Sequence, residues 1–218
     1  MAIAFIGTEY SYSLASFYAT VGAPTGTQDD DLMVAMVWCT VDASSTPPSG
    51  WTLRAIVGTR AVFTKVASSE SGTYNFYQVG GTPYPIAARI WSYRGGFDVA
   101  DPIDVASGAA YTTFNDILRA QTFSVTNENS NIIFIGDVYS ATAITISPPT
   151  SPTTFSEDSE IGSNSHYMYA ASCLWSGNGL TGDMDATISA SKNNKFAAAL
   201  ALNPKVNLNN PILVSMGF

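Results

Sequence analysis

The longest apolar run in the chain lies between Asp31 and Asp42. At ten residues it is too short for a transmembrane helix, which needs roughly 20. Its valines and tryptophan favour a strand, and a strand that is covered on both faces reads as a continuous apolar run. We therefore expect it to be the central strand of a β-sandwich. Its two faces alternate: Leu32, Val34, Met36 and Trp38 on one, and Met33, Ala35, Val37 and Cys39 on the other.

Shorter apolar or alternating runs, separated by Gly- and Pro-rich turns, predict further strands. We interpret residues 94–116 as a long crossover, with one helical turn near 114–118. No segment shows sustained helical periodicity, so the predicted fold is all-β: an antiparallel, jelly-roll-like sandwich over residues 1–204. The remaining expected strands are 2–6, 16–21, 51–57, 61–66, 73–79, 86–93, 121–125, 132–138, 167–175, 184–190 and 196–202.

One internal echo stands out. An apolar strand leads into Pro47-Pro48, and another leads toward Pro148-Pro149. Each is followed by two or three alternating strands. The echo is typical of two pseudo-symmetric halves, although a single sequence also produces such echoes by chance. We expect Trp51, just after the turn at Pro47-Pro48, to be buried, and we expect the same of Trp38.

Composition narrows the function classes. Charged residues make up 12% of the chain, about half the usual share. The net charge is −8, with nine Lys plus Arg and no basic cluster, so the phosphate-neutralising term of nucleic-acid binding is missing. The N-terminus has no basic region before its short apolar stretch, and no run reaches transmembrane length. We expect no nucleic-acid or membrane partner and synthesis in a cytoplasm.

The two cysteines are far apart in the sequence. Cys39 and Cys173 each lie within an apolar strand. The favoured interpretation is two buried thiols that act as small apolar side chains. A disulfide between two strands is the alternative.

Residues for catalysis or metal binding are scarce, and we expect no enzyme activity and no cofactor. His166 is the lone histidine, at the start of a strand, and a zinc site needs more ligands than this. A Ser-His-Asp triad is formally possible, but no Gly-x-Ser-x-Gly elbow is present. The acidic groups at 29–31 and 157–160 suggest calcium ligands or a glycosidase carboxylate pair, but neither group interleaves its carboxylates with a tight glycine as a calcium loop does, and solvated loop charge is the preferred interpretation.

Aromatic residues offer one route to ligand binding. Flat tyrosine and tryptophan rings on a β-sandwich stack on sugar faces, but the same residues also wedge between strands or line subunit contacts, which is the preferred interpretation. The tyrosines in or beside expected loops are Tyr10, Tyr12, Tyr18, Tyr84, Tyr111 and Tyr139.

A series of motifs between residues 31 and 204 resembles a pattern found in phage and prophage β-sandwich proteins. The motifs are Asp31-Leu-Met-Val-Ala, Pro48-Ser-Gly-Trp-Thr-Leu, Phe63-Thr-Lys-Val-Ala, Glu70-Ser-Gly-Thr-Tyr-Asn-Phe, Ala87-Ala-Arg-Ile-Trp-Ser-Tyr-Arg-Gly and Phe196-Ala-Ala-Ala-Leu-Ala-Leu-Asn-Pro. The resemblance implies a virion component: a head decoration, tail or fibre protein. No catalytic residues carry over from it.

The sequence after Pro204 alternates with period two, and we interpret residues 205–218 as an extended C-terminal arm. With the resemblance, this predicts a capsid decoration or cement protein on the outer surface of a phage head. Its partners would be the major capsid protein and copies of itself, as a dimer or trimer. The alternative is a carbohydrate- or receptor-binding module of a phage tail. The expected partner-binding residues are Val206, Leu208, Ile212, Val214, Met216 and Phe218.

Overall fold

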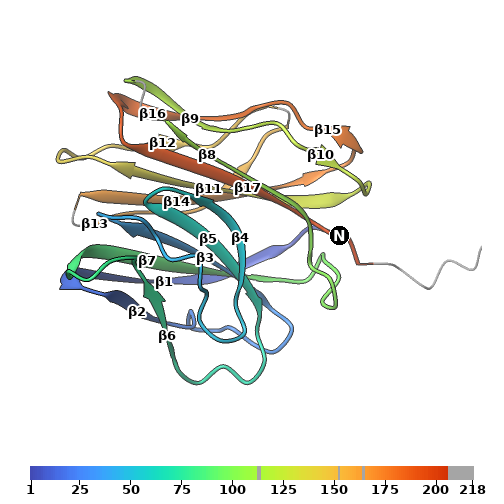
Figure 1. Ribbon diagram of the computed structural model, residues 1–218. Coiled ribbons are helices and arrows are strands. Elements are labelled where there is room, and N and C mark those ends of the chain that lie inside the picture. The colour runs from blue at the N-terminus through green and yellow to red at the C-terminus, as the bar shows by residue number, and fades with distance from the viewer. Residues whose placement is uncertain (112–113, 152, 164, 206–218) are drawn as a thin grey trace, which may run out of the picture.

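The computed structural model describes residues 1–111, 114–151, 153–163 and 165–205, and it contains strands and turns only. The predicted all-β, antiparallel sandwich is confirmed, while its jelly-roll-like strand order is not. Over these residues, no helix is long and apolar enough to cross a membrane. The strands stack in four layers, with the two largest sheets in the middle (Figure 1).

The first central sheet has the strand order β1-β7-β3-β5-β4. It places β3, the expected central strand, between β7 and β5, and all eight β3 side chains are buried. Its strands are β1 (Ala4–Ser16), β3 (Leu32–Cys39), β4 (Thr52–Val57), β5 (Arg60–Val66) and β7 (Tyr84–Arg94).

The second central sheet has the order β13-β14-β11-β17-β8. Here β11 is the middle strand and pairs antiparallel with β14 and β17. Its strands are β8 (Ile103–Tyr111), β11 (Ser130–Tyr139), β13 (Ser156–Ser163), β14 (His166–Trp175) and β17 (Lys195–Leu202).

Smaller sheets cover the outer faces of both central sheets. The pair β2 (Tyr18–Gly22) and β6 (Thr73–Tyr77) lies on the first. The second carries β12 (Ile146–Ser147), β16 (Met184–Lys192) and β9 (Asn115–Ala120), together with the short pair β10 (Ser124–Val125) and β15 (Gly179–Leu180).

Three apolar cores separate the four layers, and β3 contributes to two of them as its alternation predicts. Leu32, Val34, Met36 and Trp38 face the core between the central sheets, whereas Met33, Ala35, Val37 and Cys39 face the core under β2 and β6. The expected burial of Trp38 and Trp51 is confirmed. Cys39 and Cys173 are both free. They contact the two outermost cores, on opposite sides of the molecule, which explains why they form no disulfide.

The two halves of the chain repeat one topology. Read from its opposite edge, the second central sheet runs β8-β17-β11-β14-β13, which matches β1-β7-β3-β5-β4 strand for strand. The outer pair β2 and β6 corresponds to β9 and β16 in the same way. In this alignment β3 precedes Pro47-Pro48 and β11 precedes Pro148-Pro149, so the echo reflects a structural repeat.

Irregularities in the strands repeat as well. A β-bulge interrupts the pairing of β4 with β5 between Leu53 and Ala55, and another interrupts that of β13 with β14 between Glu157 and Ser159. The turns before β3 and β11 each contain a residue with positive φ, Asp30 at 69° and Asn129 at 60°. These matches fix which positions of the two halves are equivalent.

Several expected boundaries were wrong. The N-terminal strand β1 is 13 residues long, not five. The expected crossover at 94–116 contains β8, and the helical turn expected near 114–118 is β9. The polar segment from Ser156 forms β13, an edge strand. Ala, Gly and Ser make up about half of β1, β8 and β13, so the hydrophobic pattern of these strands carries little signal, whereas β9 is extended because it pairs with β16.

Candidate partner-binding surface

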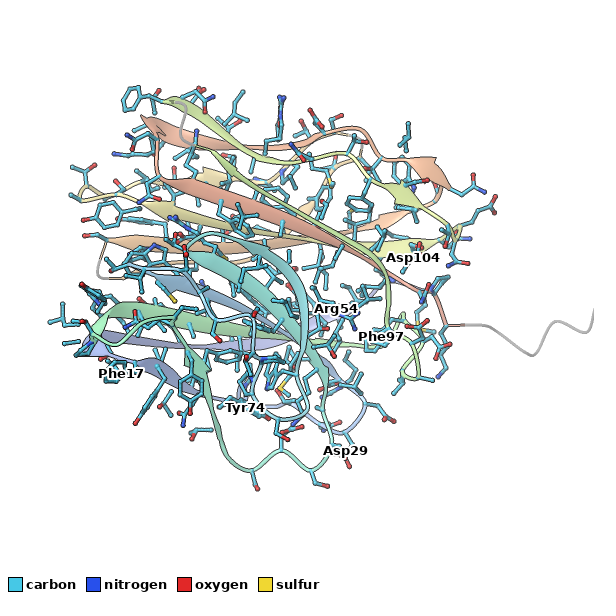
Figure 2. The ribbon with its side chains drawn as sticks, viewed as in Figure 1. Phe17, Asp29, Arg54, Tyr74, Phe97 and Asp104 are labelled. Atoms are coloured by element: carbon cyan, nitrogen blue, oxygen red, sulfur yellow. The ribbon has the colours of Figure 1, made fainter. Side chains whose placement is uncertain are left out.

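Six large apolar side chains are exposed together at one end of the first half, and we call them the aromatic patch. Each is between 39% and 73% exposed. Figure 2 marks this end with Phe17, at the turn between β1 and β2. The six are Leu14, Phe17, Tyr18, Tyr77, Val79 and Tyr84.

Backbone pairing brings these residues together from three separate segments. The end of β1 pairs with the start of β7 through Ser16 and Tyr84. Tyr18 of β2 pairs with Tyr77 of β6, and their ring centroids lie 5.5 Å apart. The amide nitrogen of Gln78 donates a hydrogen bond to the carbonyl of Phe17. The patch therefore rests on strand pairing that holds its backbone in place.

The internal repeat supplies a comparison for the patch, because the fold places other residues at the same positions in the second half. The Tyr18–Tyr77 pair corresponds to Ile117–Thr187. In each half, the next pair along the two strands is buried in the core, and these buried pairs also correspond to each other. Three further positions are fixed by strand pairing, backbone hydrogen bonds and adjacency in sequence. Phe17 corresponds to Asp116, Val79 to Ser189 and Tyr84 to Asn193. The fold does not require aromatic side chains there.

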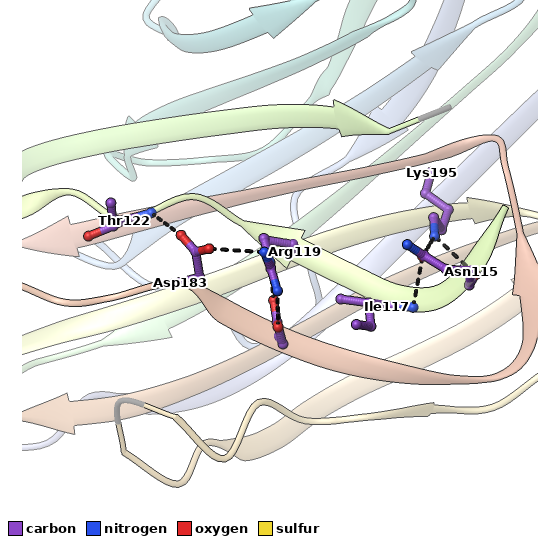
Figure 3. A network of polar contacts seen from close by, with 7 residues as sticks. Asn115, Ile117, Arg119, Thr122, Asp183 and Lys195 are labelled. Carbon is purple, nitrogen blue, oxygen red and sulfur yellow. Dashed lines mark hydrogen bonds and ion pairs between the residues drawn. The ribbon is translucent and has the colours of Figure 1, made fainter. Parts of the chain in front are cut away.

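The outer face of the second half carries a network of charged side chains (Figure 3). Arg119 forms a two-pronged pair with Asp185, with an Nε–Oδ1 distance of 2.6 Å, and a further ion pair with Asp183 at 3.1 Å. The equivalent pair in the first half is uncharged, with Thr20 donating a hydrogen bond to Asn75. The two outer faces therefore differ in charge at this equivalent pair of positions.

His166 lies at the start of β14, as expected, but it is buried. Its Nδ1 lies 3.3 Å from Asp137 Oδ1, and Arg60 Nε donates to the other carboxylate oxygen of Asp137 at 3.2 Å. Its ring packs against Trp38 with a centroid distance of 3.8 Å. His166 is only 1% exposed, so its ring does not face solvent. Through its contact with Trp38 it packs against the other half of the molecule.

Burial alone would raise the pKa of Asp137. The hydrogen bond with His166 and the charge of Arg60 outweigh that effect and hold this pKa below its ordinary value. The Asp137 carboxylate therefore contributes stability above its unfolded-state pKa and loses that contribution as the pH falls.

We expected the acidic group at 157–160 to be solvated loop charge, and this was wrong in part: the group lies in β13, where Glu157 is exposed but Asp158 and Glu160 are half-buried. Asp158 accepts hydrogen bonds from Tyr93 Oη at 3.0 Å and Ser172 Oγ at 2.9 Å. The adjacent Ser159 Oγ accepts from Trp91 Nε1 at 2.7 Å. Burial raises the pKa of Asp158 to about 6. This network fastens the edge of the second half to β7 of the first.

The acidic group at 29–31 also differs from the expectation in part. Asp31 is 1% exposed, and its carboxylate pairs with Arg94 at 2.7 Å, whereas Asp29 and Asp30 are exposed. Within the described part of the chain, no group of three or more His, Cys, Asp or Glu side chains is arranged to hold a metal ion.

The tyrosines expected in loops divide between several environments. Tyr10 and Tyr12 lie in β1 and pack against the central core, and Tyr139 ends β11. Tyr18 and Tyr84 join the aromatic patch. The rings of Tyr18 and Tyr77 are inclined at 62°, so this pair is not the coplanar platform that a sugar face would need. The side chain of Tyr111 lies outside the described residues.

Sequence reasoning missed four members of the patch: Leu14, Phe17, Tyr77 and Val79. One signal was available, because alternation in residues 73–79 places Tyr77 opposite the buried Phe76. The expected partner-binding residues lie outside the described residues, so the structure leaves them as predictions: Val206, Leu208, Ile212, Val214, Met216 and Phe218.

Comparison with models of protein families, with curated proteins and with solved structures finds no match to this chain.

Proposed function

We propose that this chain is a structural protein of a phage virion, a decoration or cement protein that binds neighbouring subunits on the outer surface of the head. The observation that carries the proposal is the aromatic patch, which the repeated fold does not require. Large exposed apolar clusters on rigid strands are a feature of protein-binding surfaces, where aromatic residues are enriched. The resemblance of residues 31–204 to virion β-sandwich proteins supplies the setting.

Binding through such a surface stabilises a shell by burying apolar area between subunits. A second contact from the same molecule, here the segment 205–218, raises the effective concentration of each contact. In this mechanism the sandwich supplies a rigid body, and its low content of charged side chains keeps the desolvation cost of close packing small. Its partners are the major capsid protein and further copies of the chain.

The alternative of a carbohydrate-binding module receives less support. Sugar binding relies on flat, accessible rings, whereas Trp38, Trp51 and Trp91 are buried. The exposed tyrosines at the patch are tilted against one another.

Purified particles of the phage or prophage that encodes the chain provide the test. We expect mass spectrometry to find the protein in the particles and immunogold labelling to place it on the head. Heads that lack it should release DNA at a lower temperature or lower chelator concentration than complete heads. Absence from purified particles would overturn the proposal.

A further inference from the structure

We propose that the aromatic patch of one copy receives the segment 206–218 of a second copy, which makes the contact between copies head-to-tail. This inference rests on the proposed function and names the surface through which copies of the chain contact each other. The segment follows the sandwich in sequence and is apolar along one side of its alternation, and the patch is a set of apolar side chains exposed together on the sandwich.

The patch and the origin of the segment lie at opposite ends of the molecule. Lys205 lines the same pocket as Asp31 and Arg94, and Arg94 pairs with Ala4 at the start of β1. The patch lies beyond the other end of β1, at Ser16. Figures 1 and 2 show this separation, with the end of β17 on one side and Phe17 on the other.

Distance then favours a second copy as the source of the segment. The 13 residues of β1 span about 43 Å at roughly 3.3 Å per residue. Residues 206–218, fully extended, reach about 43–47 Å. Within one copy, only the last residues of the segment would reach the patch, with none left to cover it. From a second copy, the whole alternating segment can lie across the patch.

The chemistry of the two surfaces is matched. The segment 206–218 contains no charged residue, and neither does the patch. Both can therefore be buried without removing a charge from water, which matters for association between chains that each carry a net charge of −8. Alternation gives the segment one apolar side, formed by Val206, Leu208, Ile212, Val214, Met216 and Phe218.

A sheet edge adjoins the patch and suits an extended segment. Among the described strands, β2 pairs only with β6, so no described strand is hydrogen-bonded to the other edge of β2. An extended segment that adds to this edge would form backbone hydrogen bonds and lay alternate side chains on Tyr18 and Phe17. Pro211 lacks an amide hydrogen, which restricts it to a position without a ladder hydrogen bond.

Complementation between two full-length variants tests the proposal. The patch variant carries Tyr77→Thr, Val79→Ser and Tyr84→Asn, which are the residues that the second half uses at the same positions. The segment variant carries Leu208→Ser, Ile212→Ser and Phe218→Ser. Leu180→Ser, exposed on β15 away from the patch, is the matched control for the first. Leu213→Ser, on the other side of the alternation, is the control for the second.

We expect wild-type protein and both controls to assemble with rising concentration in sedimentation velocity. Each variant alone should stay monomeric with an unchanged melting temperature. An equal mixture of the two variants should form heterodimers, because each retains the surface that the other has lost. A head-to-tail contact requires this result, and the heterodimer cannot extend because its free ends are the mutated ones.

Four results would overturn the inference: a wild-type monomer at every concentration, a patch variant that still assembles, a segment variant that still assembles through patch-to-patch contact, or a mixture that stays monomeric. These outcomes are independent of whether purified virions contain the protein. Failure here with the protein present in particles removes only the head-to-tail contact, whereas assembly without the protein in particles removes the proposed function.

Discussion

Arg54 and Asp158 occupy the same position in the two halves of the molecule, each at the bulge of an edge strand. Each bonds the hydroxyl at the equivalent position of the neighbouring strand: Arg54 Nε donates to Thr64 Oγ1 at 2.7 Å, and Ser172 Oγ donates to Asp158 at 2.9 Å. The β-bulge thus holds a positively charged side chain in the first half and a carboxyl side chain in the second. Asp158 also bonds across to the other half, where it accepts from Tyr93 Oη at 3.0 Å.

Asp158 gives stability a pH dependence of defined sign. Burial raises the pKa of Asp158 to about 6, so the folded state binds its proton more readily than the unfolded state does. Stability from this group is therefore greatest at acid pH and falls as the pH rises from about 4 to about 6. Asp158→Asn should remove this loss, which amounts to about 1–3 kcal/mol.

Urea denaturation of wild type and Asp158→Asn across this pH range measures the difference. Glu160 and Asp137 also titrate in the wild type, but their contributions cancel when the two curves are subtracted. We expect the free energy of unfolding of the variant, relative to that of the wild type, to increase as the pH rises. A difference that stays constant would show that Asp158 has an ordinary pKa.

Arg60 should stabilise the fold mainly by compensating the negative charge of the buried Asp137. Arg60→Met removes the cation beside this buried carboxylate and leaves His166 as its remaining partner, and loss of one partner of a buried pair costs about 3–5 kcal/mol. The double variant Arg60→Met/Asp137→Asn removes the charge as well and should be more stable than Arg60→Met alone. Chemical denaturation of both variants measures this. Equal or lower stability of the double variant would contradict the assignment.

Trp38 should contribute strongly to the central core. Trp38→Ala removes a buried ring that packs on His166, and such truncations cost about 3–5 kcal/mol. Tyr84→Ala, in the exposed patch, should change stability by no more than about 0.5 kcal/mol. Thermal melts of the two variants provide the comparison. A Trp38→Ala protein with the wild-type melting temperature would mean that β3 is misplaced.

Gly136 should tolerate no side chain while Leu118 is present. A Cβ at Gly136 would lie 2.3 Å from Leu118 Cδ2, and overpacking of this kind costs about 1–3 kcal/mol. Leu118→Ala alone should cost about 2–5 kcal/mol by leaving a cavity. Combined with Gly136→Ala, which partly fills that cavity, the loss should be smaller than the sum of the single losses. Strictly additive losses in urea denaturation would show that the two sites do not touch.

Features that depend on local pattern could be predicted from the amino-acid sequence. Alternation in β3 placed Leu32 and Met33 in different cores, because successive side chains of a strand point to opposite faces. Two apolar strands, each followed by paired prolines, indicated the repeat. Tyr18 and Tyr84 were recognised as tyrosines beside loops, although not as members of one surface.

Features that depend on partners distant in sequence follow only from the packing of the folded chain. Asp158 looked like solvated charge because the residue that buries and bonds it, Tyr93, is 65 positions away. The aromatic patch could not be predicted for the same reason. A period-two pattern shows that Tyr77 and Phe76 point to opposite faces of the strand, but it does not show which face another layer covers. Only the packing of β2 and β6 on the first sheet left Tyr77 in water, beside residues from β1 and β7.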